Sequence, residues 1–184
     1  MQINSTPIPG LLEIIPKVHS DDRGWFLELF KEESFKKVHP TIKFVQENLS
    51  FSQKGVLRGL HLQLPPFQQA KLVTVISGKV MDIVVDLRKG SATFGQTYRL
   101  VLSGTEHNIL LVPEGFAHGF VALEDSYFYY KCSSVYHPES ETGIIWNDPQ
   151  LKIDWETDNP ILSEKDTVLP TLEELLRKSV ISPS

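Results

Sequence analysis

The stretch KLVTVISGKVMDIVVDL, residues 71–87, decides the fold class of this chain. It contains two short apolar runs, Lys71–Ser77 and Lys79–Leu87, with Gly78 between them. Valine and isoleucine dominate both runs, and β-branched residues favour strands. A glycine between two runs of this length is a turn signal. The stretch therefore predicts two β-strands joined by a turn.

The same alternation of short runs and turns extends along most of the chain. Turn-forming sequences such as LPP (64–66), RKGS (88–91) and PEG (113–115) separate further runs. Many short strands at close spacing predict a sandwich, a jelly roll or a closed barrel, so we expect a mainly β fold. The further runs are Leu11–Val18, Trp25–Phe30, Phe44–Ser52, Thr97–Leu102, Asn108–Val112, Gly119–Leu123 and Tyr127–Tyr136.

Helices are expected at two places, Ser34–Val38 and Thr171–Lys178. In the second segment Thr171 suits the N-cap, and Glu173 and Glu174 suit the first turn, where negative charge is favourable. We expect this helix to pack on the outside of the barrel. The chain shows no internal repeat, low-complexity tract or linker, so we predict a single domain over residues 1–184.

Composition and charge exclude several classes of function. Hydrophobic residues make up 41% of the 184 residues, which is enough for a packed core. The formal net charge of -5 argues against nucleic-acid binding, although a pocket on an acidic protein can be locally basic. The single cysteine, Cys132, permits no intrachain disulfide and favours a reducing compartment. Because no stretch resembles a signal peptide or a membrane span, we expect a cytoplasmic protein with no membrane partner.

Two segments, 59–78 and 113–118, resemble the half-motifs of the cupin superfamily. Metal-binding cupins bring histidines and a glutamate onto a divalent ion. Here Gln63 stands at the second histidine position, and Lys71 lies near the place of the acidic ligand. A cation inside the site would repel a metal ion, so we predict no metal and no other cofactor. His61 and His118 remain; each alone could be a core histidine, but with Arg58 and Lys71 they indicate a site for an anionic, oxygen-rich ligand.

Nine blocks in order identify a closer resemblance, to the dTDP-4-dehydrorhamnose 3,5-epimerase family. The strongest are LRGLH (57–61) and GFAHGF (115–120). The resemblance covers about residues 16 to 170. It implies a homodimer of cupin-type jelly-roll barrels, each acting on the nucleotide sugar dTDP-4-dehydro-6-deoxyglucose. The blocks are Asp22–Gly24, Gln46–Ser50, Val56–Gln63, Ala70–Val73, Val84–Arg88, Thr93–Gly95, Pro113–Phe120, Trp146–Pro149 and Ser163–Asp166.

Four residues are candidates for the chemistry. The ketone at carbon 4 acidifies the protons on carbons 3 and 5, so epimerisation needs a base, an acid and a group that stabilises the enolate. His61 is the candidate base, since imidazole titrates near working pH, and by resemblance Asp166 is its partner. Lys71 is the candidate for the group that stabilises the enolate. Tyr130 is the candidate acid, because it is followed by a lysine, as the family's catalytic tyrosine is. The alternative is that Tyr130 is an aromatic residue that only fills the core.

The remaining candidates bind the substrate. Arg58 is the best internal donor for the diphosphate, and Lys165 lies beside Asp166. By resemblance, further polar positions contact the sugar or the nucleotide, and Arg23 comes from near the dimer interface. Two departures from the family, His19 and Val135, fall where an aromatic ring is usual, although Tyr136 follows directly. The further positions are Glu28, Gln46, Asn48, His118 and Asp82.

Other functions remain open on the sequence. A 3-epimerase or a 3,4-ketoisomerase would act on a related nucleotide sugar with a similar site. A non-catalytic sugar-binding cupin would need no base and acid facing one cavity. A metal-dependent cupin would contradict the interpretation of Gln63 and Lys71.

Overall fold

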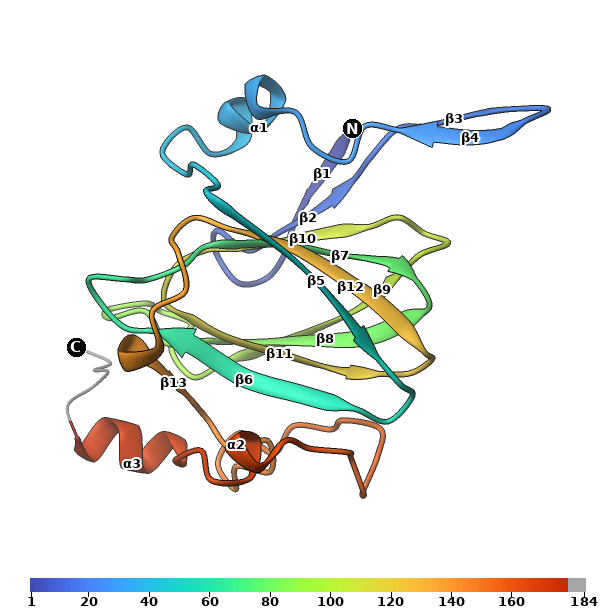
Figure 1. Ribbon diagram of the computed structural model, residues 1–184. Helices are drawn as coiled ribbons and strands as arrows, with labels where there is room; N and C mark the ends of the chain where they lie inside the picture. The colour runs from blue at the N-terminus through green and yellow to red at the C-terminus, as the bar shows by residue number, and fades with distance from the viewer. Residues whose placement is uncertain (179–184) are drawn as a thin grey trace.

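Two antiparallel sheets face each other in the computed structural model, which describes residues 1–178 (Figure 1). The six-stranded sheet has the order β1 (Gln2–Ser5), β2 (Leu12–Ile15), β10 (Ile109–Val112), β7 (Lys71–Ser77), β12 (Ser126–Cys132) and β5 (Gln46–Ser52). The five-stranded sheet has the order β13 (Glu141–Gly143), β6 (Leu57–Gln63), β11 (Phe116–Ala122), β8 (Lys79–Asp86) and β9 (Thr97–Ser103). The prediction of a mainly β fold is confirmed.

Alternation along β8 distributes its residues between two cores. Val80 and Val84 pack between the sheets, while Ile83 belongs to a cluster on the outer face of the five-stranded sheet. Successive side chains of a strand point to opposite faces, so Asp82 and Asp86 share the inward face with the two valines. Both aspartates are fully buried, and each must be paired to be tolerated there.

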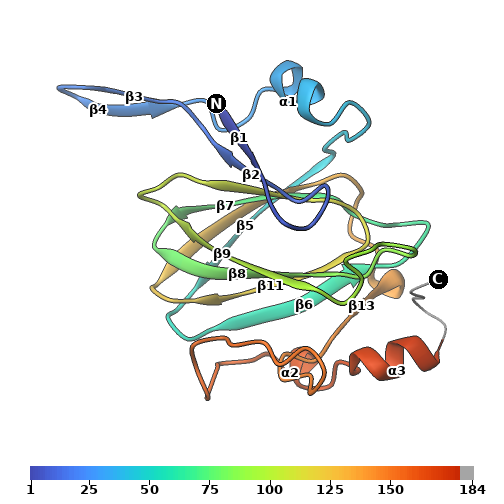
Figure 2. The same cartoon turned by 180° about the vertical axis from the view of Figure 1, so that it is seen from behind.

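The outer faces of both sheets are partly covered. Helices α2 (Glu164–Thr167) and α3 (Leu172–Arg177) lie against the five-stranded sheet, into which α3 packs Leu172 and Leu175 (Figure 2). On the opposite side, α1 (Glu32–Val38) covers part of the six-stranded sheet with Phe35. A short 3-10 turn, Pro138–Ser140, precedes β13. No helix within residues 1–178 is both long and apolar enough to cross a membrane.

The hairpin of β3 (Val18–Asp21) and β4 (Gly24–Leu27) forms its own two-stranded sheet and extends away from the barrel (Figures 1 and 2). Its aromatic residues Trp25 and Phe26 are exposed. This projection was not predicted, because the sequence shows strand and turn signals but not which surface a hairpin packs against.

Most sequence-predicted elements are observed, with shifted ends. The predicted helix at 171–178 is α3, where Thr171 and Glu174 form a reciprocal capping box: Glu174 N donates to Thr171 Oγ1 at 3.2 Å and Thr171 N donates to Glu174 Oε2 at 2.8 Å. The run predicted over Tyr127–Tyr136 ends as a strand at Cys132, and the one predicted from Gly119 begins at Phe116. Strands β1, β3 and β13 were not predicted, because four residues or fewer give little periodicity.

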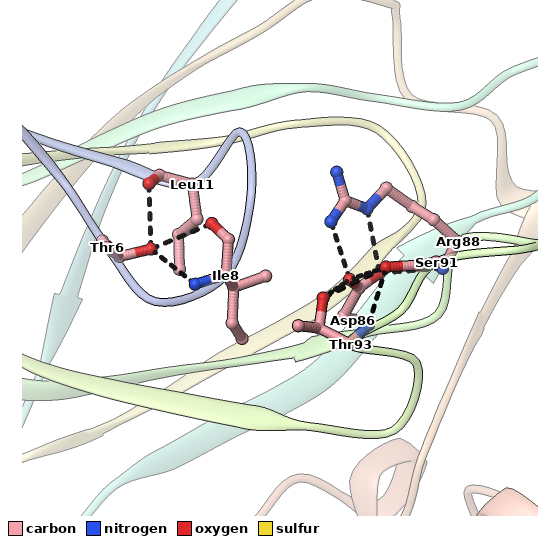
Figure 3. Close-up of polar contacts among 7 residues, drawn as sticks. All are labelled: Thr6, Ile8, Leu11, Asp86, Arg88, Ser91 and Thr93. Atoms are coloured by element: carbon pink, nitrogen blue, oxygen red, sulfur yellow. Dashed lines mark hydrogen bonds and ion pairs between the residues drawn. The ribbon is translucent and has the colours of Figure 1, made fainter.

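A polar cluster at one end of the barrel holds the loop between β8 and β9 (Figure 3). Asp86 accepts hydrogen bonds from Arg88 Nη2 at 2.7 Å, Ser91 Oγ at 2.7 Å and Thr93 Oγ1 at 2.6 Å. The Arg88 guanidinium also lies 4.4 Å from the centre of the Phe116 ring. Nearby, Thr6 Oγ1 donates to Leu11 O at 2.9 Å and fixes the N-terminal loop that buries Leu11 in the inner core.

This cluster keeps Asp86 ionised. Burial by itself raises the pKa of Asp86, but the hydrogen bonds from Arg88, Ser91 and Thr93 outweigh it and lower the pKa to about 2. The unfolded value is about 4, so the folded state binds the proton more weakly than the unfolded state does. The stabilisation is therefore complete above about pH 4 and is lost as the pH falls toward about 2.

We predict that Asp86→Asn lowers the free energy of unfolding at pH 7 by about 2–3 kcal/mol, because Arg88 loses its charged partner and one of the two acceptor oxygens becomes a donor. The variant's stability should also depend less on pH between about pH 4 and 2 than that of the natural protein. Urea unfolding at several pH values measures both effects. Asp158→Asn, which changes an exposed carboxylate, is the control. Equal stabilities for Asp86→Asn and the natural protein would contradict the assignment.

Candidate active site

Seven of the predicted site residues line one cavity of about 300 Å³ between the two sheets. The five-stranded sheet contributes one wall, the six-stranded sheet the other, and α2 closes one side. These residues are Arg58 and His61 of β6, Lys71 of β7, His118 of β11, Tyr130 of β12, and Lys165 and Asp166 of α2. The structure thus brings together side chains that are far apart in the sequence.

An irregularity in β6 allows both Arg58 and His61 to face this cavity. Regular alternation would send residues three positions apart to opposite faces. The pairing of β6 with β11 shifts register between His118 and Phe120, and Gly59 adopts a φ of 109°. A Cβ atom on Gly59 would lie 2.7 Å from Gly119 Cα, so the two strands approach too closely for any side chain there.

His61 and Asp166 form a hydrogen-bonded pair, as the resemblance implied. His61 Nε2 lies 2.5 Å from Asp166 Oδ1, and Ser163 Oγ donates to Asp166 Oδ2 at 2.9 Å. Burial raises the pKa of Asp166, but the hydrogen bond from His61 and the smaller one from Ser163 lower it overall. Because Nε2 is engaged, Nδ1 is the ring nitrogen of His61 left to act on a ligand.

Lys71 and Tyr130 stand on the opposite wall, on neighbouring strands of the six-stranded sheet. Phe128 shares the inward face with Tyr130, whereas Tyr129 faces outward and donates to Glu47 Oε2 at 2.8 Å. The predicted alternation of this strand is therefore confirmed. Burial lowers the pKa of Lys71 and raises that of Tyr130. At neutral pH the phenol keeps its proton, as a proton donor requires.

A second cavity, of about 230 Å³, adjoins the first and shares His61, Lys71 and Tyr130 with it. Two of the predicted binding residues, Gln46 and Asn48, line it. Gln46 Nε2 donates to Asn48 Oδ1 at 3.1 Å, and Gln46 Oε1 accepts from the Tyr136 backbone N–H at 2.8 Å. The two cavities together form one elongated site.

Tyr136 and Glu141 also line the second cavity, and neither was predicted as a site residue. Tyr136 Oη donates to Glu141 Oε2 at 2.6 Å, and Lys165 Nζ also donates to Glu141. The ring of Tyr136, the residue after Val135, thus lines this cavity. The adjacency of the two residues was the available signal for Tyr136. No motif marked Glu141, because its role depends on contacts with α2.

His118 is paired with Asp82. His118 Nε2 lies 2.8 Å from Asp82 Oδ2, and both residues are buried. The expectation that an inward carboxylate on β8 needs a partner is therefore confirmed for Asp82.

Arg23 and Glu28 lie elsewhere in the chain. Arg23 sits at the end of the β3–β4 hairpin with 90% of its side chain exposed, and it pairs with Asp21. Glu28 and His19 line a separate cavity of about 240 Å³ beneath α1. Within one chain the structure does not bring these residues to the elongated site, and their roles stay predictions.

Gln63 ties two loops together at the position where metal-binding cupins carry a histidine. Gln63 Nε2 donates to Phe67 O at 2.6 Å and to Val135 O at 3.2 Å, while Oε1 accepts from the His137 backbone N–H at 2.7 Å. Among residues 1–178, no group of three or more His, Cys, Asp or Glu side chains is arranged to hold a metal ion. The expectation that the protein uses no metal stays a prediction.

The fold and the cavity define a class of protein, a cupin-type jelly roll with ionisable side chains on both walls of an internal site. A family model described as dTDP-4-dehydrorhamnose 3,5-epimerase matches residues 5–174. The dTDP-4-dehydrorhamnose 3,5-epimerase of Escherichia coli K12 is 45% identical over 186 residues, which cover 99% of this chain and 100% of that protein. The chain belongs to the dTDP-4-dehydrorhamnose 3,5-epimerase family and to the isomerases.

Solved structures agree with this assignment. The epimerase RmlC of Legionella pneumophila, in complex with dTDP-4-keto-L-rhamnose, is 44% identical with a TM-score of 0.93, covering 100% of this chain and 98% of that one. ChmJ, a 3'-monoepimerase of Streptomyces bikiniensis in complex with dTDP-quinovose, is 34% identical with a TM-score of 0.90, covering 96% and 90%. The predicted cupin-type jelly roll is confirmed.

We predict that His61→Ala raises the pKa of Asp166. Burial, which raises the pKa, would remain, while the hydrogen bond that lowers it most would be lost. Carbon-13 NMR of the Asp166 carboxyl across a pH titration measures the change. Ser163→Ala, which removes a smaller contribution, should raise the pKa less. An unchanged pKa in His61→Ala would show that the two side chains are not bonded in solution.

Proposed function

We propose that this protein is a cytoplasmic dTDP-4-dehydrorhamnose 3,5-epimerase of dTDP-rhamnose biosynthesis, and that one barrel is its whole functional domain. Its substrate is dTDP-4-dehydro-6-deoxyglucose, and it inverts carbons 3 and 5. The observation that carries the proposal is the placement of the His61–Asp166 pair and Tyr130 on opposite walls of one cavity.

This placement suits proton exchange on two faces of a sugar ring. His61 Nδ1 removes the proton next to the carbonyl, and Asp166 stabilises the imidazolium that forms. At one of the two carbons Tyr130 returns a proton from the opposite side, so that carbon is inverted. The raised pKa of Tyr130 keeps its hydroxyl protonated before this transfer.

Lys71 stabilises the enolate that forms between the two transfers. Its side chain is partly buried and lines the same wall as Tyr130, where a charge acts more strongly than in water. A donor aimed at a developing oxyanion contributes about 3 kcal/mol in enzymes where one has been removed. Lys71 therefore accounts for a substantial part of the rate.

The second cavity is the proposed place of the nucleotide. Gln46 and Asn48 offer amide groups to the base, and the Tyr136 ring offers a surface for stacking. Arg58 and Lys165 stand at the first cavity with cationic groups for the diphosphate. On binding, Lys165 exchanges its pairing with Glu141 for the phosphates.

A homodimer is part of the proposal. The outer faces of β5, β12 and β7 expose Leu49, Phe51, Ile76 and Tyr127, an apolar surface of the kind that marks protein interfaces. The β3–β4 hairpin extends away from its own barrel (Figure 1), and in the proposed dimer it contacts the second copy. Arg23 and Glu28 then act in the site of that copy, which explains why neither reaches the site of its own chain.

A 3-epimerase is the second candidate, favoured by the likeness to ChmJ, a 3'-monoepimerase with the same fold. The two activities differ in how many solvent protons enter the sugar. Inversion of both carbons in heavy water incorporates a deuteron at carbon 3 and another at carbon 5. Inversion of carbon 3 alone incorporates one.

We predict that His61→Asn lowers turnover of dTDP-4-dehydro-6-deoxyglucose by about three orders of magnitude or more, because asparagine cannot act as the base. Mass spectrometry of the sugar after reaction in heavy water measures exchange, and calorimetry with dTDP checks that nucleotide binding remains. Exchange at both carbons in the natural protein supports the proposal, and exchange at one supports the 3-epimerase. The proposal would be excluded if His61→Asn exchanged protons as fast as the natural protein, or if the natural protein exchanged none.

We predict that Tyr130→Phe mainly impairs inversion at one of the two carbons. Phenylalanine keeps the ring but removes the proton donor, while His61 can still abstract both protons. NMR of the products separates singly from doubly inverted sugar. Tyr129→Phe, which changes the outward-facing neighbour, is the matched control. An equal loss at both carbons would count against Tyr130 as the acid.

A further inference from the structure

We infer that the stacked rings of Phe67 and His137 hold Tyr136 in place for the nucleotide base, so that this pair sets how tightly the base is bound. The inference rests on the proposed function, which places the nucleotide in the second cavity. In the described part of the chain, neither ring lines that cavity or the first one. Both residues act through Tyr136 and are therefore positioning residues.

The rings of Phe67 and His137 lie face to face. Their centres are 3.8 Å apart and their planes differ by only 5°, which is van der Waals contact over the ring faces. His137 Nδ1 lies 3.0 Å from Ser140 Oγ, and this hydrogen bond fixes the plane of the imidazole. Both rings are partly exposed and belong to none of the three hydrophobic clusters of the described fold. Packing of a core therefore does not explain the contact.

The stack joins two loops that continue the strands of the active site. Residues 64–70 connect β6, which holds His61, to β7, which begins at Lys71. Residues 133–137 follow β12 and include Tyr136. The ring pair thus connects the nucleotide end of the site to the strands that hold the candidate catalytic groups.

Tyr136 needs support from outside the cavity. Half of the residue is exposed, and its ring lines the second cavity. Its backbone N–H donates to Gln46 Oε1 at 2.8 Å, and its hydroxyl donates to Glu141 Oε2 at 2.6 Å. Both partners line the same cavity, where the nucleotide is proposed to bind, so neither gives a support that is independent of the ligand. The next residue, His137, gives one.

Hydrogen bonds align the two loops beside the stack. Gln63 Nε2 donates to Phe67 O at 2.6 Å, and Gln63 Oε1 accepts from the His137 backbone N–H at 2.7 Å. Gln69 Nε2 donates to Ser134 O at 2.7 Å. These bonds hold the backbone of both loops. The stacked rings add a contact between side chains, which prevents the loop that carries Tyr136 from turning about the hydrogen bonds.

A ring that is already in place binds a base more tightly than a mobile ring, because binding does not have to order it. Phe67 holds His137, and His137 holds the backbone from which Tyr136 projects. Without the Phe67 ring, the base has to order Tyr136 when it binds. The cost falls on affinity for the nucleotide and not on the proton transfers, whose groups stand on the strands of the barrel.

Calorimetry with dTDP tests the role of the ring pair. We predict that Phe67→Ala and His137→Ala each raise the Kd for dTDP about fivefold to tenfold. Phe67→Tyr keeps a ring face and should remain within about twofold of the natural protein. Gln68→Ala, which shortens a partly exposed side chain of the same loop, is the matched control. A Kd for Phe67→Ala equal to that of the natural protein would overturn the inference.

A double-mutant cycle tests whether the pair acts through Tyr136. In the Tyr136→Ala background, Phe67→Ala should raise the Kd for dTDP by less than about twofold, because no ring is left to position. A further loss as large as in the natural background would overturn the inference. Inhibition by inorganic pyrophosphate, which has no base, should change by less than about twofold in Phe67→Ala. An equal loss for pyrophosphate and dTDP would also contradict a role at the base.

Steady-state kinetics separate positioning of the base from a general loss of structure. In Phe67→Ala the KM for the nucleotide sugar should rise with the Kd for dTDP, while kcat changes by less than about twofold. A loss confined to kcat would overturn the inference. Proton NMR of the natural protein tests the contact without requiring any variant to fold: nuclear Overhauser effects between the Phe67 and His137 rings are expected, and their absence would refute the stack.

Two measurements distinguish failure of this inference from failure of the proposed function. If the natural protein binds dTDP but exchanges no deuterium, the epimerase activity is refuted and the role of the ring pair is still decided by the Kd values. If the natural protein exchanges deuterium and Phe67→Ala binds dTDP with an unchanged Kd, only the ring pair is refuted.

Discussion

The hydrogen bond between His61 and Asp166 joins parts of the chain that are 105 residues apart, and the active cavity depends on it. His61 is held by a strand of the barrel, whereas Asp166 reaches it only because α2 docks on the outside of the five-stranded sheet. The docking is driven by burial of Leu172, Leu175 and Trp155, far from the chemistry. The C-terminal segment is thus part of the site, since without its apolar contacts His61 would lose its hydrogen-bond partner Asp166.

Pairing of buried charge is the second constraint on this molecule. Four aspartates are buried within residues 1–178, and three of them are paired with cationic or ring side chains: Asp86 binds Arg88 and two hydroxyls, Asp166 binds His61 and a serine, and Asp82 binds His118 alone. The first stabilises a loop, while the other two hold imidazoles that face the cavity. A buried aspartate in this protein therefore either stabilises a loop or orients a side chain of the cavity, depending on whether its partner faces the cavity.

Gln63 occupies the position where metal-binding cupins carry a histidine. In that position a histidine would face the cavity as a ligand, but the Gln63 amide binds three backbone groups of two loops instead. These loops carry Val135 and lead into Tyr136, whose ring lines the second cavity. Gln63 therefore supports a wall of the second cavity.

Taken alone, the sequence determined most of the strands and the capped helix α3, because periodicity and capping are local properties, and its short motifs marked the candidate acid–base residues by resemblance. The tertiary structure decided which side chains meet. It placed Asp166 on His61 and Asp82 on His118, added Tyr136 and Glu141 to the site, and sent Arg23 and Glu28 outward with the hairpin. Contacts between distant segments depend on how the sheets and helices pack, and no local pattern of residues encodes that arrangement.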